Sequence, residues 1–203
     1  MKKDYDFCYH LPEEIAEIDG IHYYCADRLG VSDFEGDAVF NLTGFACIPQ
    51  LNIPQLASHV DVKYKEIVVA WPDFGIARVK PTFWSALHGY IKSQKWTKVC
   101  IHCEGGHGRT GTAIAALFIA VAEWDVPMTI EYIRSTFCQK MVESPEQMAY
   151  LCKLDEILND RVTETRNIPL PSMIIEAQKR EKENAKKLLN KACGFSYNID
   201  EEK

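Results

Sequence analysis

Short apolar runs alternate along the chain with longer segments whose apolar residues recur at helical spacing. The short runs contain many β-branched and aromatic residues and are bounded by turn-forming residues, a pattern typical of strands. This pattern predicts strands over residues 21–26, 37–42, 64–70 and 98–102. Residues 32–36 are turn-rich and separate the first two strands.

The longer segments have the periodicity of helices. The first helix is predicted over residues 81–93, where Phe83, Leu87 and Ile91 are four residues apart. Residues 110–124 are apolar at most positions, which predicts a helix buried in the core. Further helices are predicted over residues 54–60, 127–137 and 145–158.

Strands that alternate with helices are typical of an α/β fold. We therefore expect a central, mostly parallel sheet with helices on both faces. In such folds the functional site lies at the carboxyl ends of the strands. Residues 21–160 hold these elements and form one domain. Residues 1–20 are an N-terminal extension, and residues 161–203 are a linker and a charged C-terminal helix.

The C-terminal segment has two interpretations. Residues 159–171 are polar and end near two prolines, and residues 172–193 have the pattern of a lysine-rich helix. This helix is either a docking arm for an acidic partner or membrane surface, or a solvated charged helix. Opposite charges four residues apart, such as Glu176 and Arg180, favour the solvated helix.

Composition narrows the class of protein. The chain has 203 residues, enough for one domain with a full core, and its net charge of −6 argues against nucleic-acid binding through phosphate contacts. No apolar run is long enough to span a bilayer, and the basic N-terminus lacks the apolar stretch of a secretion signal. The eight cysteines are scattered and show no compact disulfide framework, so we expect a reducing, cytoplasmic location.

The most informative motif lies between the last predicted strand and the core helix. Cys103 and Arg109 are separated there by five residues, three of them glycine. These five candidate phosphate-binding positions are Glu104, Gly105, Gly106, His107 and Gly108.

This motif, the phosphate loop, combines three features that favour an anion. Glycines let backbone N–H groups turn inward around phosphate oxygens, and the start of a helix attracts negative charge. Arg109 presents a planar fork that holds two oxygens at once. Such surroundings stabilise a thiolate, so Cys103 is expected to be a nucleophile. A structural cysteine beside a helix-capping loop is the other interpretation, but it leaves the glycines and Arg109 without a purpose.

A second motif, the acid loop, precedes the phosphate loop. Asp73 lies in residues 71–75 (Trp-Pro-Asp-Phe-Gly), thirty positions before Cys103. Such a rigid tip between hinges can close over a bound phosphate and protonate the leaving oxygen, a role that contributes roughly 10²- to 10⁴-fold. Taken alone, Asp73 is better explained as an ordinary turn residue after proline.

Together the two motifs resemble those of the cysteine-dependent protein tyrosine phosphatase superfamily. The family signature is His-Cys, five residues, Arg and then Ser or Thr, and its acid loop reads Trp-Pro-Asp; both are matched without substitution. Residues 142–147 (Val-Glu-Ser-Pro-Glu-Gln) resemble its glutamine loop. The resemblance covers about residues 20–160. It implies a tyrosine-phosphatase-like fold with the phosphate loop between a strand and the core helix.

The resemblance also implies a two-step reaction. Cys103 attacks phosphorus and forms a cysteinyl-phosphate, while Arg109 and the loop N–H groups hold the equatorial oxygens. Asp73 protonates the leaving oxygen and then deprotonates the water that Gln147 positions. Thr110 is expected to hydrogen-bond the sulfur of the nucleophile and to make it a better leaving group.

Other roles follow from the same resemblance. His102 is expected to hydrogen-bond the loop backbone and to support the thiolate. Neither a metal nor a cofactor is expected, because Arg109 and the loop supply the positive charge that a metal otherwise brings. Glu143 is a candidate to brace Arg109 through an ion pair.

Three hypotheses remain for the substrate. We favour a dual-specificity protein phosphatase, because the first sixty residues contain no phosphotyrosine-recognition loop (Asn-x-x-Tyr). The second hypothesis is a phosphatase for small molecules such as inositol phosphates. Glu104 disfavours polyphosphorylated rings, but inositol-polyphosphate phosphatases of the superfamily can also carry glutamate at this position. The third is a phosphoprotein-binding module without turnover, but it conflicts with the complete set of catalytic residues. We expect a monomer that acts on phosphorylated proteins and binds no nucleic acid.

Several residues near the motifs have two interpretations each. His107 either becomes charged below about pH 6.5 and attracts an acidic substrate, or is a rim residue without such a role. Arg78 and Lys80 either contact the substrate or are ordinary surface charges. Cys47, and after it Cys100, is a candidate to capture the oxidised nucleophile in a disulfide. An ordinary buried cysteine is the simpler interpretation.

Overall fold

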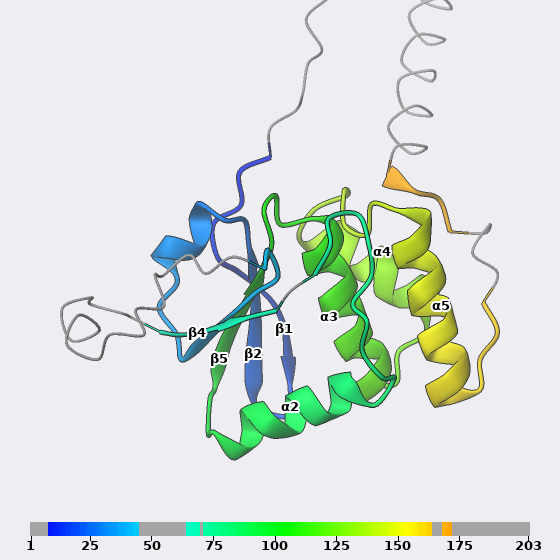
Figure 1. The fold of residues 1–203 in the computed structure, drawn as a ribbon, viewed down its shortest axis with the longest axis horizontal. Coiled ribbons are helices and arrows are strands. Elements are labelled where there is room, and N and C mark those ends of the chain that lie inside the picture. The colour runs from blue at the N-terminus through cyan, green and yellow to red at the C-terminus, as the bar shows by residue number, and fades with distance from the viewer. Residues whose placement is uncertain (1–7, 45–63, 70, 164–167, 172–203) are drawn as a thin grey trace, which may run out of the picture.

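The computed structural model describes residues 8–44, 64–69, 71–163 and 168–171 of the chain (Figure 1). Its strands are β1 (Glu13–Ile18), β2 (Ile21–Ala26), β3 (Ala38–Asn41), β4 (Lys65–Val68) and β5 (Lys98–His102). They form one sheet in the order β1-β2-β5-β3-β4. β1 is antiparallel to β2, whereas β2, β5, β3 and β4 run parallel to one another.

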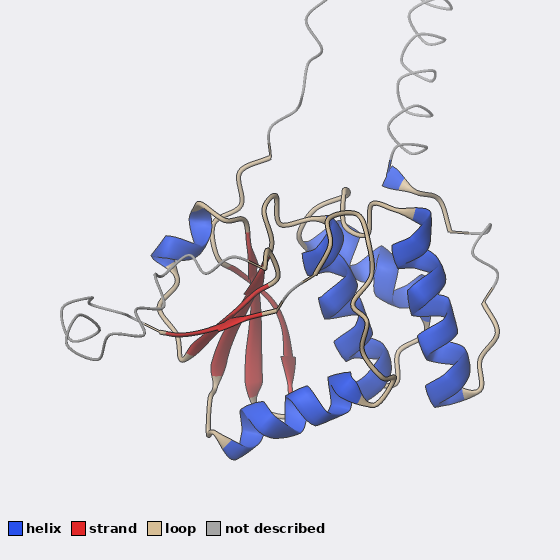
Figure 2. Cartoon of the chain, in the orientation of Figure 1, coloured by secondary structure: helices blue, strands red, loops and turns tan. Residues whose placement is uncertain are grey.

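In the described part of the chain, four α-helices pack beside this sheet and one 3₁₀ helix precedes β3 (Figure 2). They are η1 (Gly30–Asp33), α2 (Phe83–Ser93), α3 (Gly108–Val121), α4 (Val126–Thr136) and α5 (Pro145–Asn159). Asp125 and Ser144 cap the N-termini of α4 and α5, and a proline lies in the first turn of each helix. Among the described residues, no helix has the length and apolar character needed to cross a membrane.

This architecture confirms the predicted α/β fold with a central, mostly parallel sheet flanked by helices. The strands predicted over residues 21–26 and 98–102 have the bounds of β2 and β5. Those predicted over 37–42 and 64–70 extend beyond β3 and β4 at both ends. Short apolar runs rich in β-branched and aromatic residues were therefore sufficient to locate the parallel strands.

The predicted helices are also present, with shifted ends. The core helix, predicted over residues 110–124, is α3 and begins at Gly108, so Arg109 lies in its first turn. The helices predicted over residues 81–93, 127–137 and 145–158 correspond to α2, α4 and α5. Each predicted end differs from the observed end by at most two residues. The helices predicted over residues 54–60 and 172–193 lie outside the described residues.

The edge strand β1 was not predicted, and it lies within the range 1–20 that the sequence assigns to an extension. Three of its six residues are glutamate, which is depleted in strands. A register irregularity between Glu14 and Ala16 also breaks the period of two. Ile15 and Ile18 are nevertheless buried, so this part of the extension belongs to the sheet and its core.

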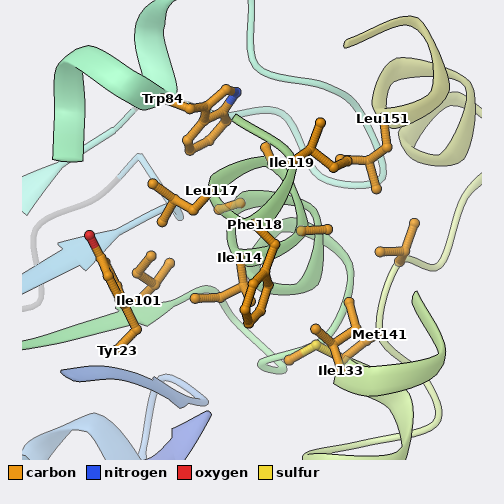
Figure 3. Packing of buried hydrophobic residues seen from close by; sticks show 14 of the residues in the cluster. Tyr23, Trp84, Ile101, Ile114, Leu117, Phe118, Ile119, Ile133, Met141 and Leu151 are labelled. Carbon is orange, nitrogen blue, oxygen red and sulfur yellow. The ribbon is translucent and has the colours of Figure 1, made fainter. Parts of the chain in front are cut away.

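The main core lies between the sheet and the α-helices, with α3 at its centre (Figure 3). Every residue of α3 from 113 to 119 is buried. Around it lie Ile101 of β5, Trp84 of α2 and Leu151 of α5, as Figure 3 shows. Because α3 is packed on all sides, its first turn, which carries Arg109, is held firmly at the end of β5.

Within the described residues, α-helices cover one face of the sheet rather than both. All four contribute to the main core. On the other face, Val39 of β3 and Cys100 of β5 pack with Val31 and Phe34 in a smaller cluster. The described connection from β2 to β3 contains only the single turn of η1.

Asp37 anchors the start of β5. Its carboxylate accepts hydrogen bonds from the backbone N–H groups of Thr97 (2.7 Å) and Lys98 (2.9 Å). Burial acts to raise the pKa of Asp37, but the hydrogen bonds from Lys98 and Thr97 outweigh it and lower the pKa overall. The contact fixes the register of the strand that leads into the phosphate loop.

Candidate active site

The phosphate loop joins the carboxyl end of β5 to the amino end of α3 (Figure 1). Cys103 directly follows β5 and is 3% exposed, and Arg109 is 6% exposed. Both side chains are therefore buried at the end of a central parallel strand. The N–H groups at the start of α3 and its dipole favour an anion at this position.

Two glycines let the loop pack closely against its neighbours. Gly106 has a φ of +73°, and a Cβ at this position would lie 2.9 Å from the carbonyl oxygen of Ala26 in β2. A Cβ at Gly108 would lie 2.5 Å from the carboxylate of Glu143 and 3.0 Å from the amide nitrogen of Gln147. The loop thus fits between the end of β2 and the glutamine loop only because these side chains are missing.

Arg109 connects the separate parts of the site. Its Nη1 donates hydrogen bonds to the carbonyl oxygens of Leu42 and Trp71, each at 3.3 Å. Its Nη2 lies 3.1 Å from Oδ1 of Asp73. The structure therefore brings the predicted phosphate clamp and the predicted general acid together.

Internal hydrogen bonds shape the acid loop. Nε1 of Trp71 donates to the carbonyl oxygen of Gly75 (2.9 Å), and the N–H of Gly75 donates to the carbonyl oxygen of Pro72 (3.1 Å). The side chain of Asp73 is 64% exposed, whereas that of Arg109 is 7% exposed. The carboxylate thus reaches from an exposed tip to a buried guanidinium, which suits a group that meets a ligand arriving from solvent.

The glutamine loop holds the acid loop in place. Oγ of Ser144 donates to the carbonyl oxygen of Phe74 (2.7 Å) and accepts from the N–H of Gln147 (3.2 Å). Gln147 is fully buried. Its Nε2 donates to the carbonyl oxygen of Gly75 (3.4 Å), and its Oε1 accepts from the N–H of Glu143 (2.9 Å). The capping box of α5 therefore places Gln147 between the acid loop and the phosphate loop.

Two supporting residues were missed in the sequence. Arg134 of α4 is 9% exposed and donates to the carbonyl oxygens of Met141 (3.0 Å), Val142 (3.3 Å) and Pro169 (2.6 Å). Burial lowers its pKa to about 10, so it stays charged at neutral pH. Its position four residues after Ile130, on the apolar face of α4, was the sequence signal that could have found it. Ser144 could have been found, because Ser-x-x-Gln is a capping-box pattern.

In the described part of the chain, the expected hydrogen bond is present for His102 and absent for Thr110. Nδ1 of His102 lies 3.1 Å from the carbonyl oxygen of Cys103, so the imidazole bonds the loop backbone as the resemblance implies. Burial lowers the pKa of His102, which favours its neutral form. Oγ1 of Thr110 is buried and has no hydrogen-bond partner among the described residues, so the expected bond to the sulfur is absent here. The role of Thr110 in the second step stays a prediction.

Neither of two rim residues of the phosphate loop, Glu104 and His107, provides a positive charge that would attract an acidic substrate. Glu104 is exposed and forms an ion pair with Arg28 at 3.1 Å. Burial, together with the nearby His10 and Lys140, lowers the pKa of His107 to about 4. His107 is therefore neutral at the pH of most cells, which contradicts the hypothesis that its charge attracts an acidic substrate.

The predicted ion pair between Glu143 and Arg109 is wrong for this structure. Among the ion pairs of the described residues, Arg109 pairs with Asp73, and Oε1 of Glu143 lies 3.7 Å from Nδ1 of His107. The physical reason is Gly108, whose missing side chain lets Glu143 approach the loop and accept a hydrogen bond from its backbone.

The remaining candidates stay predictions. Arg78 and Lys80 are exposed and follow the acid loop, and no contact of theirs decides between the two interpretations. Cys100 is buried in the small cluster on the other face, and burial raises the pKa of its thiol, which disfavours a reactive thiolate. Cys47 lies outside the described residues.

The fold and this site define a phosphatase domain of the dual-specificity type. Residues 77–157, which include the phosphate and glutamine loops, match the family described as "Swiss Army Knife protein, DSP-PTPase phosphatase domain". Through this match the chain belongs to the cysteine-dependent protein tyrosine phosphatase superfamily, in its dual-specificity-like branch.

The chain is also similar to individual proteins and solved structures. The uncharacterized protein MJECL20 of Methanocaldococcus jannaschii is 31% identical over 118 residues, which cover 54% of this chain and 77% of the relative. A mutant form of Tk-PTP superposes with a TM-score of 0.55 at 19% identity, over 74% of this chain and 98% of that one. A leucine-rich-repeat and phosphatase-domain protein of Entamoeba histolytica gives 0.53 at 9% identity, over 76% and 96%. At these identities the two structures support the fold alone.

Proposed function

We propose that this protein hydrolyses phosphotyrosine, and also phosphoserine or phosphothreonine, in protein substrates through a cysteinyl-phosphate intermediate. The observation that carries the proposal is the pair formed by Asp73 and Arg109, 3.1 Å apart. In this pair the proposed proton donor lies beside the group that we expect to hold phosphate, next to the loop that begins with the buried Cys103. A nucleophile, an anion clamp and an acid in one place are the parts that phosphate-ester hydrolysis needs.

In the first proposed step, Sγ of Cys103 forms a bond to phosphorus while the ester oxygen leaves with the bonding electrons. Arg109 and the loop N–H groups stabilise the three non-bridging oxygens, and Asp73 gives its proton to the leaving oxygen. In the second step, water held by Gln147 attacks phosphorus and passes a proton to Asp73. The sulfur–phosphorus bond breaks, so that inorganic phosphate and the thiolate are restored.

The proposed setting follows from this chemistry. A thiolate nucleophile is easily oxidised, so a reducing cytoplasm suits the protein. All the proposed catalytic groups come from one chain, and a monomer is therefore sufficient. The preference for proteins and for more than one phosphorylated residue type rests on the missing Asn-x-x-Tyr segment in the first sixty residues.

The test is phosphate release from phosphotyrosine, phosphoserine and phosphothreonine peptides and from inositol polyphosphates. We expect no release by Cys103→Ser. Asp73→Asn should be slower on the peptides by roughly 10²- to 10⁴-fold. It should be much less impaired on p-nitrophenyl phosphate, whose leaving group departs without a proton. The matched controls Cys152→Ser and Asp160→Asn should retain activity.

Each contrary result removes one part of the proposal. Full peptide turnover by Asp73→Asn would exclude its role as the acid. Release from inositol polyphosphates alone would replace the protein substrate by a small molecule. If the wild-type chain released phosphate from none of the substrates but bound phosphopeptides, it would be a binding module.

A further inference from the structure

Four potential metal ligands converge beside the phosphate loop, and none of them is a proposed nucleophile, acid or clamp. They are Cys8, His10, His107 and Cys138, all of them half-buried. Each offers one ligand atom, and the four atoms lie within 4.8 Å of one another. The residues come from three distant parts of the chain: the segment before β1, the phosphate loop and the segment after α4.

The distances suit a tetrahedral ion. Zinc bonds of about 2.3 Å to sulfur and about 2.0–2.1 Å to nitrogen place neighbouring ligand atoms ~3.3–3.8 Å apart. Nε2 of His10 and Nε2 of His107 are 2.9 Å apart, and the thiols of Cys8 and Cys138 share a hydrogen bond. The ligand atoms therefore already face one another, and shifts of about 1 Å would complete the coordination.

Surrounding contacts hold both imidazoles in position. The N–H of His10 donates to Oδ2 of Asp27 (2.7 Å), and its carbonyl oxygen accepts from the N–H of Asp27 (3.1 Å). The ring of His10 packs on Phe137, with ring centroids 4.5 Å apart. Nδ1 of His107 lies 3.7 Å from a carboxylate oxygen of Glu143. A carboxylate near the second ring nitrogen is the usual partner of a metal-bound histidine.

We propose that Cys8, His10, His107 and Cys138 bind one zinc ion. Two thiolates and two imidazoles form a donor set that zinc prefers in closed structural sites and that magnesium and calcium do not. On binding, the two thiols release their protons to solvent and each imidazole keeps its remaining proton on Nδ1, with no change of oxidation state. The two thiolates balance the charge of the ion beside the cationic Lys140.

The proposed ion has a structural role. Through His107 it ties the segment before β1 and the segment after α4 to the phosphate loop. It does not involve Cys103, so zinc at this site would stabilise the loop without blocking the nucleophile. Metal content is measured without substrate, so zinc binding can be tested independently of phosphatase activity.

The test uses the full chain in reducing buffer with Zn²⁺ or Co²⁺ as the probe. After gel filtration we expect roughly one zinc per chain. Bound Co²⁺ should show the visible bands of a tetrahedral site and a thiolate charge-transfer band. Cys8→Ser, His10→Gln and Cys138→Ser should each weaken binding by at least the roughly 10- to 100-fold that losing an outer-shell partner typically costs. The matched controls Cys152→Ser and His22→Gln should bind as the wild type does.

Cys103→Ser separates the proposed site from zinc bound at the nucleophile, and it should keep the full stoichiometry. Metal that is lost from Cys103→Ser but kept by Cys138→Ser would overturn the proposal. A wild-type chain that binds no zinc would do the same, as would a Cys8–Cys138 disulfide that persists in reducing buffer. If circular dichroism shows that Cys138→Ser is unfolded, Cys8→Ser decides, because Cys8 lies at the end of the described chain.

Discussion

Gly106 is the position at which the phosphate loop is most sensitive to an added methyl group. Its φ of +73° costs an L-residue roughly 1–2 kcal/mol. The new Cβ would also lie 2.9 Å from the backbone carbonyl oxygen of Ala26, a collision that typically costs about 1–3 kcal/mol. Gly106→Ala should therefore lower the free energy of unfolding by about 2–5 kcal/mol.

Substitutions at two other glycines separate the cost of the positive φ from the cost of the collision. Gly20, in the two-residue turn between β1 and β2, has a φ of +78° but no atom within 4 Å of an added Cβ. Gly20→Ala should thus cost only the conformational part, about 1–2 kcal/mol. Gly89 in α2 has neither a positive φ nor a neighbour within 4 Å. Gly89→Ala should stabilise the protein by about 0.5–1 kcal/mol.

Urea and thermal unfolding of the three variants give the comparison. A chain of 203 residues shifts its Tm by about 2–4 °C for each kcal/mol. If Gly106→Ala and Gly20→Ala lowered the free energy of unfolding equally, the predicted collision with β2 would be refuted. If Gly89→Ala were less stable than the wild type, the conformational argument would be refuted. Phosphate release by Gly106→Ala, measured where the variant is still folded, should also fall, because the loop N–H groups must move.

Three further predictions concern side chains that hold the site in place. Ser144→Ala removes the cap of α5 and a hydrogen bond to the acid loop; a loss of about 1–2 kcal/mol is expected in urea unfolding, and an unchanged midpoint would contradict it. Arg134→Met leaves carbonyl groups of the glutamine loop without donors and should cost about 3 kcal/mol, partly recovered in Arg134→Lys; equal stabilities of the two variants would count against these bonds. Asp37→Asn should cost about 1 kcal/mol near pH 7, after allowance for its exposure. Since its pKa is lower in the folded state, Asp37 stabilises the fold above its ordinary pKa of about 3.9, and this contribution disappears as the pH falls through the folded value; a difference that persists in acid would exclude the linkage.

Part of the fold could not be predicted because local pattern and tertiary contact disagree. The glutamates of β1 are typical of a surface segment, yet Ile15 and Ile18 pack into the core once the strand pairs with β2. Arg134 carries a charge typical of an exposed helical residue, but it is buried because backbone carbonyl groups of the glutamine loop accept its hydrogen bonds. In both cases the deciding partner lies on another element.

The candidate site also has a part that the sequence predicts and a part that it does not. Cys103, Arg109 and the loop glycines were predictable, because a strand, a glycine-rich turn and a helix N-terminus are contiguous in sequence. The partner of Arg109 was not predictable: the sequence offered Glu143, whereas in the structure Arg109 pairs with Asp73 and Glu143 lies beside Gly108 and His107.

The sequence by itself determined the parallel strands, the buried core helix and the phosphate loop, since each depends on the spacing of residues within one segment. Only the tertiary structure decided which segments meet. It brought Asp73 to Arg109, Gln147 to the acid loop, and Cys8 and His10 to His107 and Cys138. Contacts of this kind depend on how the sheet and helices pack in three dimensions, and no local periodicity encodes them.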